Sequence, residues 1–550
     1  MDNNQNELNG SGAGNVAVQP YAAWKQAFAA NAEGGLVAKP TVTEMEDTEA
    51  LKTMRAKFSF FAPATLLYAV FYAFCMFKND AGIAYLLFII ATIVYMKMSL
   101  TRLDMKLKKG SAFYFAAMVL LAVSTFCTDD SRILIFNKLG IFLLAMSLML
   151  RTFYRTDAWG LGKYLKNIVC LIFGSLAELV RPFDDAENYL KTDGKKNKNI
   201  GYVLLGALIS VPLLLVVISL LSEADVFFEQ MTNRFLGLFE MESIAWIISR
   251  IAIVFFATYL IVARLCRHSL SEKVTDRRTG EPVLAITVTA MLTVVYLLFS
   301  GIQIFGLFLG QLQLPQGYTY AEYAREGFFQ LLAVSILNLI LVLVGMSFFR
   351  ESKGLKGVLT VMSLCTFVMI ASSAMRMIMY ISCYDLTFLR ILVLWTLGLL
   401  TMLFIGVLIS IFSRQFKLFR YSIIVVTLLY LGLSFSHPDY IVAYVNVQKE
   451  TVDYRYLEKL SADAAPILVP YIRTRDTVSV TQDAYGERKF VLITDEYYHK
   501  APSDFGLKYM ESINEKAQAL GIRTFNVSRF MAAQARDEWI RMVFPPKTVQ

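Results

Sequence analysis

The sequence predicts an all-α protein: a polytopic bundle of about 11 transmembrane helices followed by a small, mostly helical C-terminal tail. Hydrophobic residues make up 56% of the 550 residues and charged residues only 18%, whereas soluble chains average about 45–50% and about 25%. The mean hydropathy is +0.51. Segments of about 20 apolar residues, the length that crosses a hydrocarbon core about 30 Å thick, recur between residues 58 and 437.

The first segment, 1–57, is expected to be a disordered cytoplasmic arm. It is rich in Asn, Gly, Ala and acidic residues and has too little periodic apolar pattern to bury a core, apart from a short helical stretch around 21–30. No basic, apolar and small-residue series marks a removed signal peptide. The first span is therefore expected to drive membrane insertion.

Hydropathy divides the membrane part into a four-span bundle at 58–150 and a seven-span bundle at 200–437, joined by a cytoplasmic connection at 151–199. The predicted spans are 59–77, 82–101, 111–127, 133–150, 200–222, 244–265, 283–310, 327–349, 357–381, 389–412 and 420–436.

The orientation follows from the distribution of lysine and arginine, because basic residues are retained on the cytoplasmic side. Alternate connections beginning with 97–110 contain 25 basic residues, whereas the other connections contain four, or seven when membrane-edge residues are included. We therefore predict a cytoplasmic N-terminus and an extracytoplasmic C-terminal tail.

Segment 163–180 has two possible interpretations. Its apolar stretch is short and basic at both ends, which favours an interfacial or re-entrant helix on the cytoplasmic face. The alternative is a twelfth span. A crossing here would place Arg181 and the lysines of 191–198 outside and invert every later connection.

The tail, 438–550, has helical spacing of apolar residues at 454–460 and 505–520 and a short strand pattern around 489–494. It is predicted to be a small, mostly helical extracytoplasmic appendage.

Signatures of cofactor and metal sites are not found in the sequence. It has no phosphate-binding glycine loop, no H-E-x-x-H and no nucleophile elbow, and its three histidines are far apart. Its six cysteines have no C-x-x-C spacing. We expect no cofactor, no metal site and no disulfide framework. The net charge of +9 is dispersed between apolar segments, so we expect the lipid bilayer, and no nucleic acid, as a partner.

Charged residues of both signs stand at span ends that are predicted to face the same leaflet. Basic residues there oppose the positive-inside preference, so acidic neighbours are expected to hold them. A structural ion-pair network is one interpretation and a ligand pocket is the other; Arg376 could also reach water by snorkelling. The candidate outer polar cluster comprises Glu223, Asp225, Arg325, Glu326, Arg376, Tyr380, Asp385 and Arg390.

Other polar or small residues within spans are more simply explained by packing. Gln303, Asn338 and the pair Ser372 and Ser373 are expected to form hydrogen bonds between helices, and Gly306 with Gly310 to allow close helix approach.

Several motifs occur in a fixed order: Arg181-Pro182-Phe183, LSEADVF at 221–227, YAREGFF at 323–329, RMIMY at 376–380 with LTFLR at 386–390, the segment from His437-Pro438-Asp439 to Asn446, and YLEKLSADA at 456–464. From about residue 165 to 470 the chain resembles bacterial multi-pass proteins known only as domains of unknown function, the related classes four-one-seven-three and four-one-five-three. The resemblance implies a location in a bacterial inner or plasma membrane and no known activity.

Three functions are compatible with these observations. The first is a non-enzymatic cell-envelope sensor or accessory subunit that contacts an envelope protein or a lipid. The second is a transporter or flippase whose two bundles move around a site between them. The third is an intramembrane transferase acting on a lipid-linked substrate. The first is favoured for two reasons. Acidic residues at midspan are scarce, which counts against a transporter, and the sequence lacks a long, acid-bearing early outer loop, which counts against a transferase.

Overall fold

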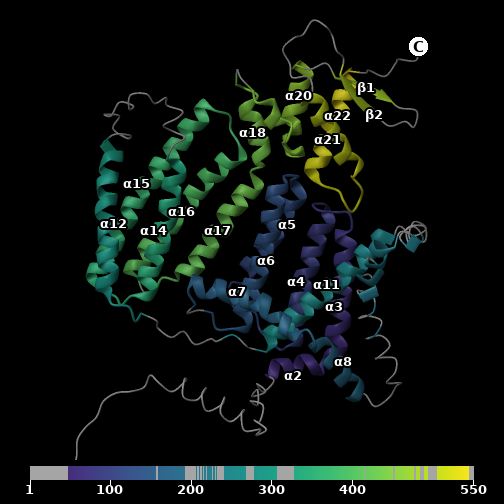
Figure 1. The fold of residues 1–550 in the computed structure, drawn as a ribbon, viewed down its shortest axis with the longest axis horizontal. Helices are drawn as coiled ribbons and strands as arrows, with labels where there is room; N and C mark the ends of the chain where they lie inside the picture. The colour runs from purple at the N-terminus through teal and green to yellow at the C-terminus, as the bar shows by residue number, and fades with distance from the viewer. Residues whose placement is uncertain are drawn as a thin grey trace, which may run out of the picture. The chain divides into compact units, whose positions relative to one another are not determined.

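The structure is a computed structural model. It describes residues 48–156, 159–192, 241–267, 278–305, 327–413, 415–449, 452–475, 478–482, 488–492 and 505–543, with isolated residues between 206 and 231 and at 270. The predicted fold class is confirmed: these residues form a polytopic helix bundle followed by a mostly helical tail (Figure 1).

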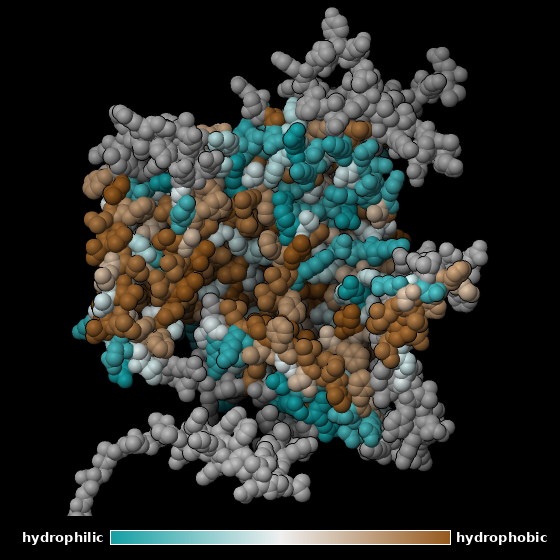
Figure 2. All heavy atoms as spheres, in the orientation of Figure 1, coloured by the Kyte–Doolittle hydropathy of each residue, from teal (hydrophilic) through white to brown (hydrophobic). Residues whose placement is uncertain are grey.

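Nine helices of the described residues are long and apolar enough to cross a membrane. Figure 2 shows an apolar belt across them, with hydrophilic residues gathered mainly toward the helix ends. A tenth predicted span corresponds to α5 (Ser111–Cys127), an apolar helix of 17 residues. The predicted span 200–222 lies largely outside the described residues. The nine are α3 (Phe58–Met76), α4 (Ile83–Arg102), α6 (Ser131–Phe153), α11 (Met241–Cys266), α12 (Pro282–Gln303), α14 (Phe328–Phe348), α15 (Lys353–Cys383), α16 (Phe388–Phe412) and α17 (Leu418–Phe435).

The first helix group contains α3, α4, α5 (Ser111–Cys127), α6 and α11 around one apolar core. This differs from the sequence-based division, which assigned α11 to the second bundle, because α11 packs against α3. Residues 49–56, which were expected to belong to the disordered arm, form helix α2 (Glu49–Ala56). Leu51 and Met54 of α2 are buried in the same core.

The connection after α6 explains why α11 joins the first group. It forms α7 (Leu161–Ser175), η1 (Leu176–Glu178) and α8 (Arg181–Thr192), and both α7 and α8 contact α11. The buried carboxylate of Glu178 pairs with Arg264 and Arg267 at the end of α11. Asp185 accepts a hydrogen bond from Tyr259 at 2.8 Å and pairs with Arg55. At 15 residues, α7 is shorter than the roughly 20 residues needed to cross a membrane. The assignment of 163–180 as an interfacial or re-entrant helix stays a prediction.

The second helix group contains α12, α14, α15 and α16, with α15 packed against the other three. The predicted hydrogen bonds between helices are confirmed. Asn338 donates to Thr366 at 3.0 Å, Ser372 donates to Gln303 at 2.6 Å, and Ser373 donates to the carbonyl of Phe328. Gly306 and Gly310 lie outside the described residues.

Helix α17 connects the two groups because it packs against α16 on one side and α5 on the other. A buried polar chain joins it to the first group. Asn137 of α6 accepts hydrogen bonds from Tyr430 and Ser434 of α17, each at 2.7 Å, and Ser434 also contacts Ser124 of α5.

The C-terminal domain follows α17 directly and has its own apolar core. A two-stranded antiparallel hairpin, β1 with β2, is the one sheet among the described residues, and β2 overlaps the strand predicted at 489–494. The elements of the C-terminal domain are α18 (Pro438–Asn446), α19 (Tyr454–Leu457), η3 (Ala462–Ala464), α20 (Ala465–Arg475), β1 (Val478–Gln482), β2 (Arg488–Leu492), α21 (Phe505–Gln518) and α22 (Val527–Val543).

Candidate functional site

Within the described residues, the C-terminal domain contacts the helix bundle at three connections between spans. The backbone N–H of Ile83 donates to the carbonyl of Phe525 at 2.8 Å, at the start of α4. Asn446 exchanges two hydrogen bonds with the backbone of Leu386, between α15 and α16. The third contact is at 128–130, between α5 and α6. All three connections belong to the set that the count of basic residues predicts to be extracytoplasmic.

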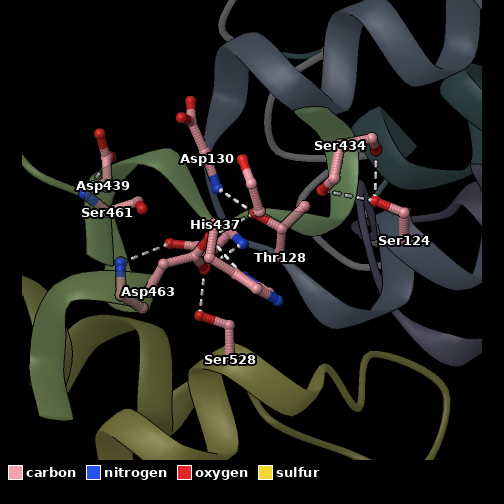
Figure 3. A network of polar contacts seen from close by, with 12 residues as sticks. Ser124, Thr128, Asp130, Ser434, His437, Asp439, Ser461, Asp463 and Ser528 are labelled. Atoms are coloured by element: carbon pink, nitrogen blue, oxygen red, sulfur yellow. Dashed lines mark hydrogen bonds and ion pairs between the residues drawn. The ribbon is translucent and has the colours of Figure 1, made fainter. Parts of the chain in front are cut away.

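Four buried aspartates meet at the contact with the α5–α6 connection, and we call Asp129, Asp130, Asp439 and Asp463 with their partners the four-aspartate network. Figure 3 shows Thr128 of the α5–α6 connection, His437 of the segment after α17 and Ser528 of α22 around Asp463. The network therefore joins parts of the chain that lie more than 300 residues apart.

Asp463, in η3, is the centre of this network. Its carboxylate accepts hydrogen bonds from the hydroxyls of Thr128 and Ser528 and from the backbone N–H of Asp129 at 2.8 Å. Nδ1 of His437 lies 3.1 Å from Oδ2 of Asp463. One side chain thus holds the α5–α6 connection, α22 and the start of α18 together.

Asp129 attaches the last two helices of the tail. Its carboxylate forms ion pairs with Lys516 of α21 at 2.8 Å and with Arg529 of α22 at 2.6 Å, and it accepts the backbone N–H of Ala462. Because two cations share one buried acid, this part of the network carries a surplus positive charge.

Arg132, in the first turn of α6, is a single cation that pairs with two acids. Its guanidinium holds Asp130 through two bonds of 2.8 Å and also pairs with Asp439 of α18. It lies 4.0 Å from the centre of the Phe388 ring, a cation–π contact with the start of α16. Asp439 in turn accepts the backbone N–H of Ser461 at 2.9 Å.

The network contains four carboxylates and four groups that can carry a positive charge. Four carboxylates face three permanent cations, Arg132, Lys516 and Arg529, and a charged His437 supplies the fourth positive charge. Buried charges are tolerated when they are paired and hydrogen-bonded.

The pKa values reflect the same arrangement. Burial raises the pKa of Asp463, but the hydrogen bonds from His437, Ser528, Thr128 and the backbone of Asp129 outweigh it and hold the pKa below its ordinary value of 3.8. The hydrogen bond to Asp463 raises the pKa of His437 above 6.5 despite burial. Burial, together with the charge of Asp130, raises the pKa of Asp439 against the attraction of Arg132.

Asn526 provides a neutral anchor beside these charges. It is fully buried at the start of α22, and its amide donates to the carbonyls of Ala81 at 3.0 Å and Thr128 at 2.9 Å. It therefore ties α22 to two of the three connections, and these carbonyls would lose their partner if the side chain were removed.

The chemistry of the site is that of a clamp. Ser528 and His437 both bind Asp463 and are not joined to each other, so the donors do not form a nucleophile–base pair. The oxygens of the four carboxylates are engaged by protein donors. Among the described residues, no group of three or more His, Cys, Asp or Glu side chains is arranged to hold a metal.

The predicted outer polar cluster is partly described. Arg376 is buried near the end of α15, and its Nη1 would lie 3.0 Å from a Cβ atom on Gly327, which has a φ of +105°. The guanidinium of Arg390 stacks on the ring of Tyr380 at 4.3 Å. Asp385 pairs with Lys449 of the tail at 3.7 Å and accepts the backbone N–H of Asp453.

The other four members of the predicted cluster are either outside the described residues or exposed. Arg325 and Glu326 lie outside them, and Glu223 and Asp225 are exposed, with Asp225 accepting the backbone N–H of Phe228 at 2.7 Å. Convergence of all eight residues stays a prediction. Among the described members, Tyr380, Asp385 and Arg390 lie around the connection that the C-terminal domain holds.

The family match begins inside α5 and covers the α5–α6 connection, the helices from α6 to α17 and the start of the tail. A family model described as Domain of unknown function (DUF4153) matches residues 115–471, more than half of the chain. The chain belongs to this family. The match contains Asp129, Asp130, Asp439 and Asp463 and ends before α21 and α22. No curated protein matches the chain. No solved structure matches it either.

The four-aspartate network was not predicted from the sequence, although two signals were present. Asp129 and Asp130 form an acidic pair directly before a span, and the motifs at 437–439 and 461–464 carry Asp439 and Asp463. Lys516, Ser528 and Arg529 had no such signal, because they lie in a tail whose docking cannot be read from hydropathy.

Proposed function

We propose that this multi-pass membrane protein is a non-enzymatic cell-envelope sensor or accessory subunit whose C-terminal domain receives a signal or partner and passes it to the helix bundle. The four-aspartate network carries this proposal. It attaches the domain to the outer ends of α5 and α6 through charged groups that must stay paired. A change in the domain that breaks one pair therefore changes the stability of the bundle ends.

The proposed location is a bacterial plasma or inner membrane, with the N-terminus in the cytoplasm and the C-terminal domain outside. The excess of basic residues on alternate connections supports this orientation. The docking of the C-terminal domain supports it as well, because its contacts fall on the connections that are poor in lysine and arginine.

The proposal is tested by asking whether a change in the network is felt at the opposite end of the bundle. Hydrogen exchange is measured on the full chain in lipid nanodiscs, comparing the unsubstituted protein with Asp463→Asn. We expect altered exchange in the connections 350–356 and 413–420. Glu511→Gln, which changes an exposed acid of α21, is the matched control and should leave them unchanged. Changes confined to the tail and 128–132 would mean that the domain is a static cap.

The second candidate, a transporter or flippase, is favoured by a cavity of about 1380 Å³ between the two helix groups. Residues of α14, α15 and α16 line one side, and residues of α6, α7 and α17 line the other. Movement of a fluorescent phospholipid between the leaflets of proteoliposomes tests this candidate, because a sensor would leave its distribution unchanged.

A further inference from the structure

The cavity between the helix groups has apolar walls and a basic mouth. Leu339 and Leu343 of α14 and Leu403 and Val407 of α16 are part of its wall. Six basic residues and one acid stand among the described residues that line it: Arg151, Lys163, Arg278, Lys356, Lys417, Arg420 and Glu351. Its volume of about 1380 Å³ exceeds the roughly 300–1,000 Å³ of sites for small ligands.

The single acid does not neutralise this mouth. Glu351 already pairs with Arg278 and with Lys356, the latter at 3.2 Å. The remaining basic side chains come from α6, α7 and the start of α17, across the cavity from α15. The cavity thus combines a hydrocarbon-like interior with an opening that attracts anions.

Two arginines approach each other at this opening. A Cβ atom on Gly110 would lie 3.3 Å from Nη2 of Arg420 and 3.5 Å from Nη1 of Arg151, so the two nitrogens are no farther apart than the sum of these distances. Arg151 donates only to the carbonyl of Lys109, and neither arginine has a carboxylate partner among the described residues. Like charges held this close without an acid repel each other, and a bound anion would relieve the repulsion.

Gly110 makes this approach possible. Its φ of +89° and its missing side chain leave room for both guanidinium groups at the start of α5. The two arginines come from different helices: Arg151 lies at the end of α6, and Arg420 lies in the first turn of α17. An anion between them would also bridge α6 and α17.

We propose that this cavity binds an anionic phospholipid, with its phosphate between Arg151 and Arg420 and its acyl chains along α14 and α16. A guanidinium pair suits phosphate because each fork can donate two parallel hydrogen bonds. The apolar walls assign the ligand to a lipid, since a free phosphate would leave them uncovered. The site does not depend on the role of the C-terminal domain.

Native mass spectrometry of the delipidated full chain tests the site, with dioleoyl phosphatidylglycerol and dioleoyl phosphatidylcholine as probes. We expect preferential retention of phosphatidylglycerol and about a tenfold loss of it in the double variant Arg151→Gln/Arg420→Gln. The matched control is Arg102→Gln/Arg350→Gln, which removes two arginines that do not line the cavity. An equal loss in the control would show that only surface charge acts, and would overturn the proposal.

The apolar part of the site is tested separately by Leu343→Trp, which narrows the cavity at its apolar wall and keeps both arginines. We expect weaker retention of phosphatidylglycerol at an unchanged melting temperature. A third arm adds inorganic phosphate alone. Binding of phosphate by the arginine pair together with no preference between the two lipids would assign the pair to a soluble anion and contradict the lipid site.

Discussion

His437 and Asp463 are in direct contact, with Nδ1 of the histidine 3.1 Å from Oδ2 of the aspartate. His437 precedes α18 and adopts a left-handed conformation with φ of +47°, while Asp463 lies in η3. The same carboxylate accepts hydrogen bonds from the α5–α6 connection and from α22. This contact therefore links a titratable group to the docking of the whole C-terminal domain.

The raised pKa of His437 predicts that docking weakens as the pH rises. Protonated His437 is favoured in the folded state, so its stabilisation is fully present below the unfolded pKa of 6.5 and is lost as the pH rises through the higher folded pKa. We expect the melting temperature of the full chain in detergent to fall as the pH rises above about 6.5, and His437→Gln to flatten this dependence.

The neighbouring acid does not confuse this measurement. Because the pKa of Asp463 is lowered in the folded state, the stabilisation from this carboxylate is fully present above pH 3.8. It is lost only as the pH falls through the lower folded pKa, far below the pH range in which His437 titrates. Asp129, Lys516 and Arg529 face the same network from the α5–α6 connection, α21 and α22. An identical slope in His437→Gln would assign the pH dependence to another group.

Arg132 predicts an asymmetric double-mutant cycle. Arg132→Gln leaves Asp130 and Asp439 facing each other without a cation, and we expect a loss of about 3–5 kcal/mol of unfolding free energy. Asp439→Asn alone should cost less, because burial already raises the pKa of this acid. In the Arg132→Gln background it should recover part of the loss, with a coupling of about 0.5–3 kcal/mol. Additive effects in denaturant titrations would argue against the shared pairing.

Hydropathy predicted the positions of the spans closely, but not which helices pack against each other. The predicted segment 111–127 coincides with α5, and 389–412 differs from α16 by one residue, because the length of an apolar helix is set by the bilayer. The packing of α11 on α3 could not be predicted, since apolar helices are alike in composition. Glu178 and Asp185, which contact Arg264, Arg267 and Tyr259, lie more than 70 residues from these partners in the chain.

The candidate site was harder to predict than the spans. The outer polar cluster was chosen from charges at span ends, whereas the four-aspartate network also needs α21 and α22, whose partners lie about 400 residues earlier in the chain. Thr128 and Asp463, for example, are joined across 335 positions. No periodic pattern reports such a contact.

Asn526 is predicted to be essential for docking although it carries no charge. Asn526→Ala removes the donor to the buried carbonyls of Ala81 and Thr128, and we expect a loss of about 1–3 kcal/mol. Asn526→Asp should be worse, because a carboxylate would face carbonyl oxygens. Gln534→Ala, an exposed amide of α22, serves as the control in thermal unfolding. Equal stability of Asn526→Ala and the control would remove this anchor from the account.

The distribution of basic residues predicts the topology. A reporter fused after Gln550 should behave as extracytoplasmic, and one inserted near Lys195 as cytoplasmic. Opposite results at both positions would invert the orientation. An unexpected result at Lys195 alone would make 163–180 a crossing helix.

The central claim is that the four-aspartate network holds α21 and α22 on the helix bundle. It is tested most directly by inserting a protease site between β2 and α21 and measuring whether the released C-terminal fragment stays with the membrane fragment during size-exclusion chromatography. We predict that the fragments co-elute in the unsubstituted protein and in the control Glu511→Gln/Gln534→Ala, and separate in Asp463→Asn/Asn526→Ala. Separation of the unsubstituted fragments, or co-elution of the doubly substituted ones, would contradict the account.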